Sequence, residues 1–342
     1  VNLQIPSIMK RMKIMKLVAL AFGVGSIVFI SSCKKEGPAG ADGTPGVDGN
    51  AVCMECHNLD TKSDITDQYA ASGHAEGLTV GYAGGRNGCA MCHSDQGFVE
   101  TQYTGHDTTA SDIPIPQAIR CETCHDFHQS LDFFNEPNAA LRTIEPVDLL
   151  MYRAAGSSMT IDLGKSSNLC ANCHQPRRVG PSDDGSGMAM VTSTHYGPHH
   201  GTQATTLAGL GAYELGSGYP DPGTGGKHVT DATCVSCHMH DGDHTAAPSL
   251  EGCNTAACHN GTMTTVSENS RQLEFATLMA TLESKLIAAG LILDGHPNPG
   301  TYPVDEVGAL YNYEWLLDDG SNGVHNFQYT EALLTNSIAV FP

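Results

Sequence analysis

The sequence has few aromatic side chains for a chain of 342 residues. Aromatic residues make up 6% of it, tryptophan occurs once, and there are 38 glycines and 17 prolines. This composition supplies too little apolar bulk for a conventional hydrophobic core of the expected size. The chain is rich instead in residues that bind metals and cofactors, with 13 cysteines and 17 histidines. We therefore expect a bound group to fill much of the interior.

Basic residues are also scarce. Lys and Arg number 17 against 37 Asp and Glu, which gives a formal net charge of −20. Such a charge repels phosphate backbones and excludes nucleic acid as a favoured partner. The preferred interpretation is an acidic, well-solvated surface in an extracytoplasmic compartment, and docking to a basic partner is the alternative.

Long hydrophobic runs are absent apart from residues 17–30. This apolar run, LVALAFGVGSIVFI, follows a basic segment and is short for a membrane span, which is typical of an export leader. It ends in ISSC, which resembles the lipobox of bacterial lipoproteins and implies lipidation of Cys33. Plain secretory cleavage near Ser32, with Cys33 left unpaired, is the alternative. We expect residues 1–32 to be a lipoprotein signal peptide.

The residue composition of the rest of the chain changes twice. Four Gly-X-Y triplets after Cys33 are too few for collagen, so residues 33–50 are interpreted as the lipidated cysteine plus a polar tether. Residues 51–265 carry the other cysteines among turn-forming residues. Residues 266–342 have none and show helical periodicity, with helices expected at 267–290, 305–317 and 328–337. The predicted fold is mostly irregular with short α-helices around a core packed by the bound group, plus an α-helical C-terminal unit packing on the cysteine-bearing region.

Five segments share the pattern Cys-X-X-Cys-His: CMECH, CAMCH, CETCH, CANCH and CVSCH. In this pattern the two thiols attach to the vinyl groups of haem and the histidine coordinates the iron. Zinc ribbons or disulfides would not need a histidine directly after every second cysteine. The predicted thioether residues are Cys53, Cys56, Cys89, Cys92, Cys121, Cys124, Cys170, Cys173, Cys234 and Cys237, with His57, His93, His125, His174 and His238 as proximal iron ligands.

A sixth segment, CNTAACH, has four residues between its cysteines instead of two. Small residues make a bulge between the two thioethers feasible, whereas a disulfide would leave the histidine unexplained and a metal site would need further ligands. We therefore predict a sixth haem on Cys253 and Cys258, with His259 as its proximal ligand. The expected cofactor is six covalently bound haem c groups.

The distal face of each iron needs a second ligand, and eleven histidines remain once the six motifs are satisfied. Methionine is the rival ligand, but Met54 and Met91 lie inside attachment loops and Met239 follows a proximal histidine directly. Two imidazoles per iron are therefore expected, and they favour a low reduction potential.

These motifs resemble those of multihaem c-type cytochromes related to the cytochrome c nitrite reductase and hydroxylamine oxidoreductase group, including bacterial extracellular electron-transfer cytochromes. The resemblance covers about residues 53–340. It implies distal ligands in the segments SGHA, CHDFH, KHVTDATC, DGDHTAAP and GVHN, namely His74, His128, His228, His244 and His325. The segment HYGPHHG offers the sixth, for which His200 is chosen, and the alternatives are His195, His199, His106 and His296.

The leading functional hypothesis is a lipid-anchored hexahaem carrier that passes electrons to or from an extracytoplasmic partner, such as another cytochrome. We expect an exported, outer-membrane-anchored lipoprotein on the periplasmic or cell-surface side. One alternative is an enzyme in which one open haem reduces nitrite or oxidises hydroxylamine, although no haem motif ends in lysine as nitrite reductases of that group usually have. The other is a subunit of a cytochrome filament, a homo-polymer in which one subunit's histidine ligates the next subunit's haem.

Overall fold

The computed structural model describes residues 54, 57–128, 140–164, 166–266 and 269–342. The predicted signal peptide, Cys33, the tether, and the first pair of thioether cysteines, Cys53 and Cys56, lie outside the described residues. By its internal contacts the chain divides after Lys62, and each part is considered by itself.

Most of the cysteine-bearing region consists of loops and helices of one or two turns, which confirms the predicted fold class. Polar caps and glycines delimit these helices. For example, the Ser94 hydroxyl accepts the backbone N–H of Gly97, and Gly105 ends the same helix in a left-handed conformation. The helices before residue 260 are α3 (Leu59–Ala70), α4 (Gly73–Glu76), the π-helix η1 (Val80–Gly84), α5 (Ala90–His93), α6 (Asp95–Thr104), α7 (Cys121–Cys124), α8 (Leu150–Ala154), α9 (Ser166–Ala171), α10 (Gln203–Ala208), α11 (Lys227–Thr230), α12 (Cys234–His238), the 3-10 helix η2 (His240–Gly242) and α13 (Leu250–Cys253).

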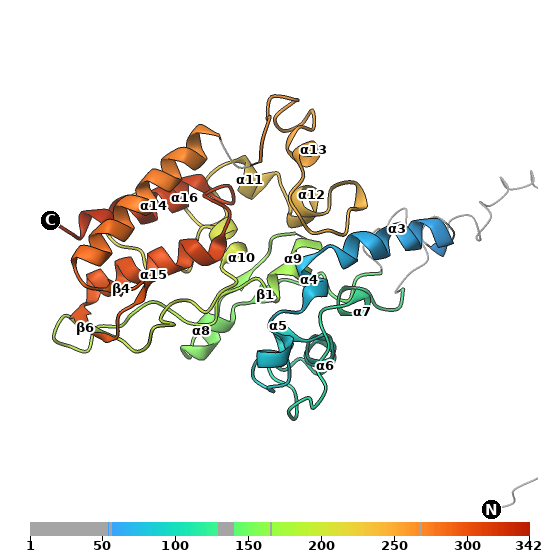
Figure 1. Cartoon of the computed structure of the whole chain (residues 1–342), viewed down its shortest axis with the longest axis horizontal. Coiled ribbons are helices and arrows are strands. Elements are labelled where there is room, and N and C mark those ends of the chain that lie inside the picture. Colours follow the sequence, from blue (N-terminus) through green and yellow to red (C-terminus); the bar gives the residue numbers. More distant parts are fainter. Residues whose placement is uncertain (1–53, 55–56, 129–139, 165, 267–268) are drawn as a thin grey trace, which may run out of the picture. The chain divides into compact units, whose positions relative to one another are not determined.

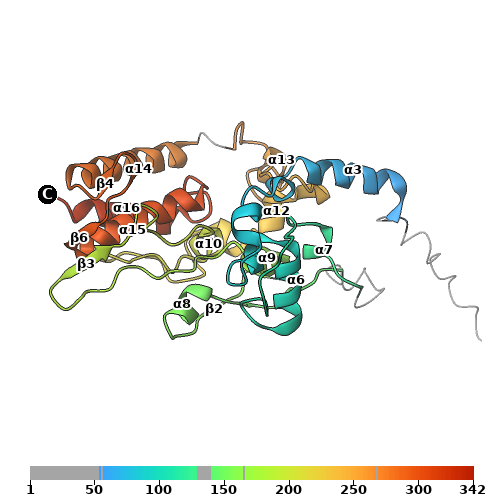
Figure 2. The same cartoon turned by 60° about the horizontal axis from the view of Figure 1, so that its bottom comes forward.

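Three longer helices form the C-terminal unit, as predicted. They are α14 (Ser270–Ala288), α15 (Val304–Asp319) and α16 (Phe327–Ala339), and they lie side by side in both views (Figures 1 and 2). A capping box starts α14, because the Asn269 side chain accepts two backbone N–H groups and the Gln272 side chain accepts the Asn269 N–H. Gly320 ends α15 in a left-handed conformation.

The hydrophobic core of this unit extends into the middle of the chain. Leu282, Leu310 and Leu333 are fully buried within it, and it shares its cluster with residues from Val147 to Leu215. The single tryptophan, Trp315, is also fully buried, and its indole Nε1 donates to the Thr206 hydroxyl at 2.9 Å. The C-terminal helices are therefore joined to the segment that carries the fourth haem motif.

The strands of the described residues form two-stranded antiparallel pairs. They are β1 (Val147–Asp148) with β2 (Thr160–Ile161), β3 (Met188–Val191) with β6 (Gly300–Pro303), and β4 (Ile292–Leu293) with β5 (His296–Pro297). The β3–β6 pair aligns Met188 with Pro303 and Val191 with Gly300, and so fastens the mid-chain loop to the start of α15.

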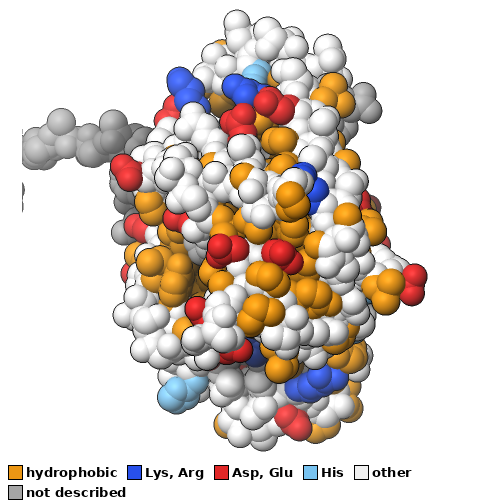
Figure 3. All heavy atoms as spheres, turned by 90° about the vertical axis from the view of Figure 1, so that its left-hand side faces the viewer, with side chains coloured by type: hydrophobic (Ala, Val, Ile, Leu, Met, Phe, Trp, Pro, Cys, Tyr) orange, Lys and Arg blue, Asp and Glu red, His pale blue; other side chains and the backbone are white. Residues whose placement is uncertain are grey.

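Residues 57–128 bury few apolar side chains. Their buried hydrophobic residues are Ala83, Ala90, Met91 and Phe98, and they expose large ones that include Leu78, Tyr82, Tyr103, Ile115 and Phe127. On the face formed by the C-terminal helices and strands, hydrophobic side chains are also exposed, with acidic side chains among them (Figure 3). Within the described part of the chain, every helix is too short or too polar to span a bilayer.

Candidate haem-binding sites

The regular attachment motifs fold as tight helical turns. In three of them the histidine N–H donates to the carbonyl of the first cysteine, at 3.2 Å for His93, 2.8 Å for His125 and 3.0 Å for His174. Such a turn places positions i, i+3 and i+4 on one face, so two thiols and an imidazole share a side of the backbone. The ten described cysteines are all free thiols, as haem attachment requires.

The irregular sixth motif closes in the same way. The His259 N–H donates to the Cys253 carbonyl at 3.0 Å, although two more residues lie between them than in the other motifs. The insertion is taken up by a turn in which the Thr255 carbonyl accepts the N–H groups of Cys258 and Asn260. The Asn254 side chain donates to the Met263 carbonyl at 2.8 Å and fixes the loop. The bulge therefore preserves the backbone closure that joins the first cysteine to the histidine.

Five motif histidines each face a histidine from another segment. In every pair, one ring belongs to a predicted proximal ligand and the other to a histidine outside the motif of that ligand. The distances between ring centres are 6.2 Å for His174 and His74, 6.5 Å for His93 and His199, 6.4 Å for His125 and His244, 6.1 Å for His259 and His228, and 6.4 Å for His238 and His325.

This spacing matches what an iron between two imidazoles requires. A metal–imidazole bond is about 2 Å long, so two such bonds in line, plus the distance from each nitrogen to its ring centre, give about 6 Å between ring centres. Direct hydrogen bonds between the rings would not explain why the same spacing recurs in five separate places. The residues present therefore fit a six-coordinate haem iron at each of these five sites.

Most of these imidazoles use Nδ1 to bind the protein, which leaves Nε2 free for a metal. Such a bond fixes ring orientation and tautomer. The Nδ1 partners are the Thr79 hydroxyl for His93 (2.9 Å), the Gln203 amide oxygen for His174 (3.3 Å), the Val324 carbonyl for His228 (2.7 Å), the Ala246 carbonyl for His238 (2.9 Å), the Gly242 carbonyl for His244 (2.7 Å) and the Asp319 carboxylate for His325 (2.7 Å).

These partners could not be found from the sequence. Thr79, Gln203 and Asp319 belong to no motif, and Gln203 lies 29 residues from its histidine. Their only signal is tertiary proximity.

Burial keeps several of these histidines neutral, which is the form that binds iron. Desolvation lowers the pKa of the ring below its ordinary value for His74, His93, His125, His174 and His199, and it lowers the pKa of His199 to about 4.

His199, and not the chosen His200, faces His93. Its Nε2 is buried and has no hydrogen-bond partner within the described residues. The His200 ring lies 5.6 Å from the His199 ring, between ring centres, and its Nδ1 pairs with the Asp318 carboxylate at 2.8 Å. Both histidines have a left-handed backbone, with φ of 73° and 58°, a strained conformation for a non-glycine residue that is concentrated at functional sites. The geometry therefore favours the alternative, His199.

The other candidate histidines differ in their surroundings. His195, His106 and His296 are exposed. His240 lies 3.6 Å from the Asp241 carboxylate. Both thioether cysteines of the first motif lie outside the described residues, so its iron site, and the role of His128 as a distal ligand, stay predictions.

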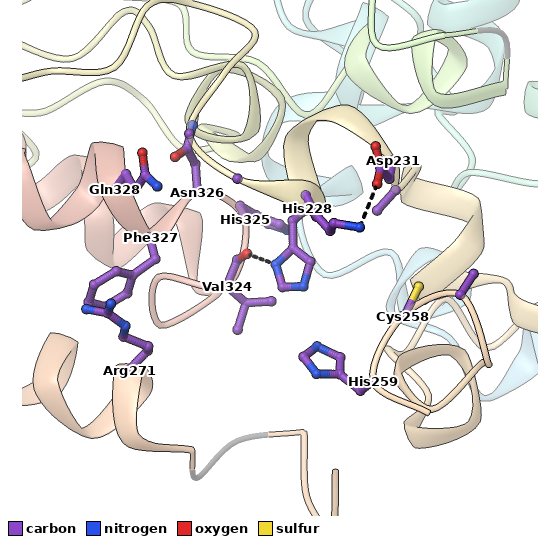
Figure 4. A pocket seen from close by; sticks show the side chains of 15 residues that line it. His228, Asp231, Cys258, His259, Arg271, Val324, His325, Asn326, Phe327 and Gln328 are labelled. Atoms are coloured by element: carbon purple, nitrogen blue, oxygen red, sulfur yellow. Dashed lines mark hydrogen bonds and ion pairs between the residues drawn. The ribbon is translucent and has the colours of Figure 1, made fainter. Parts of the chain in front are cut away.

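A cavity of about 310 Å³ lies beside the sixth motif (Figure 4). His228 projects into it from α11 and His259 from the sixth attachment loop, while Cys258 lies at its edge. Lys227 and Arg271 supply positive charge to its lining, and the Arg271 guanidinium stacks 4.5 Å from the centre of the Phe327 ring. A hollow with two facing imidazoles, a thiol and cations suits a haem, whose propionates are anionic.

The attachment loops touch one another in a series. The Cys92 thiol lies 3.9 Å from the Asn172 carbonyl and the Cys173 thiol 3.7 Å from the Met91 carbonyl, so the second and fourth loops meet reciprocally. The third loop reaches the second through a buried hydrogen bond from Thr123 to Asp95 at 2.7 Å.

Two further contacts extend the series. The Cys234 N–H donates to the Ser167 hydroxyl at 3.2 Å and joins the fifth loop to the fourth. The Ser249 N–H donates to the Cys237 carbonyl at 3.0 Å and joins the sixth loop to the fifth. The loops thus follow the order third, second, fourth, fifth and sixth.

Sequence comparison finds distant relatives among curated proteins. The chain is 21% identical over 332 residues to the C-type polyheme cytochrome OmcB of Geobacter sulfurreducens, a match that covers 75% of this chain and 44% of that protein. It is also 21% identical over 331 residues to the C-type polyheme cytochrome OmcC of the same species, covering 74% and 42% respectively. The chain thus spans less than half the length of the curated relatives it matches.

A solved structure, that of the outer cell wall cytochrome OcwA, aligns with a TM-score of 0.49 and 20% identity over 79% of this chain and 48% of that one. No protein-family profile matches the chain. The repeated attachment motif and the distant likeness to polyhaem cytochromes both support a multihaem c-type cytochrome with covalently bound haem c.

Proposed function

We propose that the chain is a hexahaem electron-transfer protein that conducts electrons along a series of bis-histidine haems. The observation that carries this proposal is the set of five histidine pairs at 6.1–6.5 Å, each joining a motif histidine to a histidine from elsewhere. Bound haem iron alternates between ferric and ferrous states and so supplies one-electron chemistry at each site. The chain's own residues orient the ligands and set the potentials.

The sixth haem of the proposal rests on the irregular motif. The hydrogen bond from His259 to Cys253, the facing His228 and the adjacent cavity give this site the same features as the regular ones. The first site completes the count of six through Cys53, Cys56 and His57, and His128 remains the distal ligand proposed from the sequence.

For the second site we propose His199 as the distal ligand in place of His200. The buried, unpartnered Nε2 of His199 and the 6.5 Å between the ring centres of His199 and His93 support this assignment.

The contacts between loops support conduction. Loops that touch hold their haems near one another, so we infer a path in the order third, second, fourth, fifth and sixth. A paired histidine at each of five sites also disfavours an open, substrate-binding iron there. Electron transfer therefore accounts for the geometry better than nitrite or hydroxylamine chemistry does.

We further propose that the protein is exported and anchored by lipid on Cys33, where it exchanges electrons with an extracytoplasmic acceptor or another cytochrome. The leader pattern, the tether and the extracytoplasmic attachment of c-type haem support this placement. Replacement of Cys33 by alanine should move the haem protein from the membrane to the soluble fraction. Retention in the membrane would remove the lipid anchor from the proposal.

A reductive titration of the purified holoprotein tests the electron-transfer function. The proposal expects uptake of six electrons per chain at low potentials, followed by complete reoxidation by a soluble ferric chelate. Uptake of five electrons or fewer, or a haem that stays reduced while the others are reoxidised, would contradict a continuous six-haem path.

A further inference from the structure

Among the six proposed ligand histidines whose Nδ1 binds the protein, one differs in the group that accepts its Nδ1 proton. Hydroxyl, amide or carbonyl oxygens, all neutral, serve His93, His174, His228, His238 and His244. His325 instead donates to a carboxylate, Asp319 Oδ1, at 2.7 Å. The Asp319 side chain has 0% of its surface exposed. A full negative charge is thus held against one ligand of the fifth site in a place that water does not screen.

Asp319 is fixed in this role by its surroundings. It is the last residue of α15, so the negative end of the helix dipole adds to its own charge. Its second oxygen, Oδ2, accepts the hydroxyl and the N–H of Ser321, the latter at 3.3 Å. Within the described residues neither Lys nor Arg forms an ion pair with it.

A carboxylate on Nδ1 strengthens the imidazole as an electron donor to a metal at Nε2. Stronger donation stabilises ferric iron over ferrous iron and lowers the reduction potential, and a nearby buried negative charge acts in the same direction. The second site has cationic residues near its proposed ligand as well as the Asp318 carboxylate. The backbone N–H groups of Arg177 and Arg178 donate to the Pro198 carbonyl at 3.0 and 3.3 Å, which places two cationic residues beside His199.

We propose that Asp319 is a positioning residue that acts through His325 and makes the fifth site the lowest-potential haem among the five paired sites. This inference rests on the proposed haem chain. The fifth loop lies between the fourth and the sixth. Electron transfer onto the fifth haem, which has the lowest reduction potential of the five, is therefore energetically uphill and lies in the interior of the path. Electrons that enter at the sixth site cross that step before they reach the fourth, second and third sites.

The test compares two isosteric substitutions at neighbouring residues in the holoprotein. Asp319→Asn removes the negative charge that lies beside His325 and keeps an oxygen at Oδ1. Asp318→Asn is the matched control. It removes an equal charge from the neighbouring residue, which pairs with His200 and not with His325. Potentiometric titration followed by visible absorption should show the lowest-potential component shifted upward in Asp319→Asn, with the remaining components in place. Asp318→Asn should leave the lowest component unmoved.

A second measurement does not depend on a variant that folds. In the unaltered protein, one low-spin EPR signal should have a narrower spread of g values than the rest, as a ligand with imidazolate character gives, and it should be the last to disappear on reduction. The inference is wrong if Asp319→Asn, with all haems retained, leaves the lowest component in place or shifts every component equally. A shortage of haems or of low-spin signals in the unaltered protein would instead reject the proposed haem chain.

Discussion

At the scale of single residues, the account depends on histidines whose two ring nitrogens have separate roles. In six of them the protein binds Nδ1, which leaves Nε2 for a metal. His199 shows the requirement most clearly, because its Nε2 is the one buried side-chain polar atom without a partner among the described residues. A buried imidazole nitrogen without a partner is costly unless something binds it, and in this chain haem iron would.

Replacement of His199 by alanine should therefore leave one iron without its distal ligand. We expect a high-spin ferric EPR signal equal to one haem per chain and a matching loss of low-spin signal. His200→Ala is the control and should keep the spectrum of the unaltered protein. If His200→Ala gave the high-spin signal and His199→Ala did not, the assignment of the second site would be reversed.

Glu314, on α15, gives a pH prediction. Burial and the nearby Asp318 raise the pKa of its carboxyl from 4.5 to about 7, with His200 opposing the shift. Because the folded-state pKa is raised, the stability this group contributes is fully present below about pH 4.5 and is lost as the pH rises through about 7. Glu314→Gln should therefore raise the melting temperature at pH 8 relative to the unaltered protein and change it little at pH 4. An equal change at both pH values would count against a titrating Glu314.

The sequence predicts local chemistry at this scale and misses what depends on distant contacts. A Cys-X-X-Cys-His motif identifies its own proximal ligand because all of its parts lie within one turn. The choice between His199 and His200 depends on two left-handed backbone conformations and on Asp318, which is 118 residues away. Nothing in HYGPHHG itself contains that information.

At the scale of elements, α15 and the loop after it organise the ligands of several sites. Asp318 holds His200, and Asp319 holds His325. Gln203, whose Oε1 accepts from His174, donates its Nε2 to the Asp318 carbonyl at 2.8 Å. The C-terminus of α15 thus connects ligands of the fourth and fifth sites, and it also holds His200, the neighbour of the proposed second-site ligand. The helical periodicity of residues 305–317 predicted the helix, but not these contacts of its C-terminus.

The sixth attachment loop gives a prediction about an element. Its closure by His259 and Cys253 predicts six haem adducts in the intact mass of the unaltered protein. The double substitution Cys253→Ala and Cys258→Ala should remove the mass of one haem. Cys33→Ala should leave the haem count unchanged and serves as the control. Five adducts and two free thiols in the unaltered protein would show that CNTAACH binds no haem.

At the scale of the whole molecule, the chain has two kinds of interior. Buried apolar side chains gather in the cluster that runs from Val147 to Phe341, whereas residues 57–128 contribute only four buried hydrophobic side chains and expose several large ones. The low aromatic content of the sequence predicted this shortage of buried apolar side chains. It could not show where in the chain the shortage would fall, because burial depends on which segments pack together.

This division predicts how the chain depends on its cofactor. In the haem-free protein, proteases should cleave residues 57–128 first and leave fragments from the C-terminal helices, since those retain a hydrophobic core. The holoprotein should resist cleavage in both regions. Mass spectrometry of timed digests measures the order of cleavage. Equal rates in the two regions of the haem-free chain would contradict a haem-dependent interior.

Low-temperature EPR of the oxidised holoprotein, with spins counted against total haem, measures whether every iron in a chain of six has two imidazole ligands. We expect low-spin bis-histidine signals to account for all six haems. A high-spin ferric signal amounting to a whole haem per chain would show that one iron lacks its second imidazole.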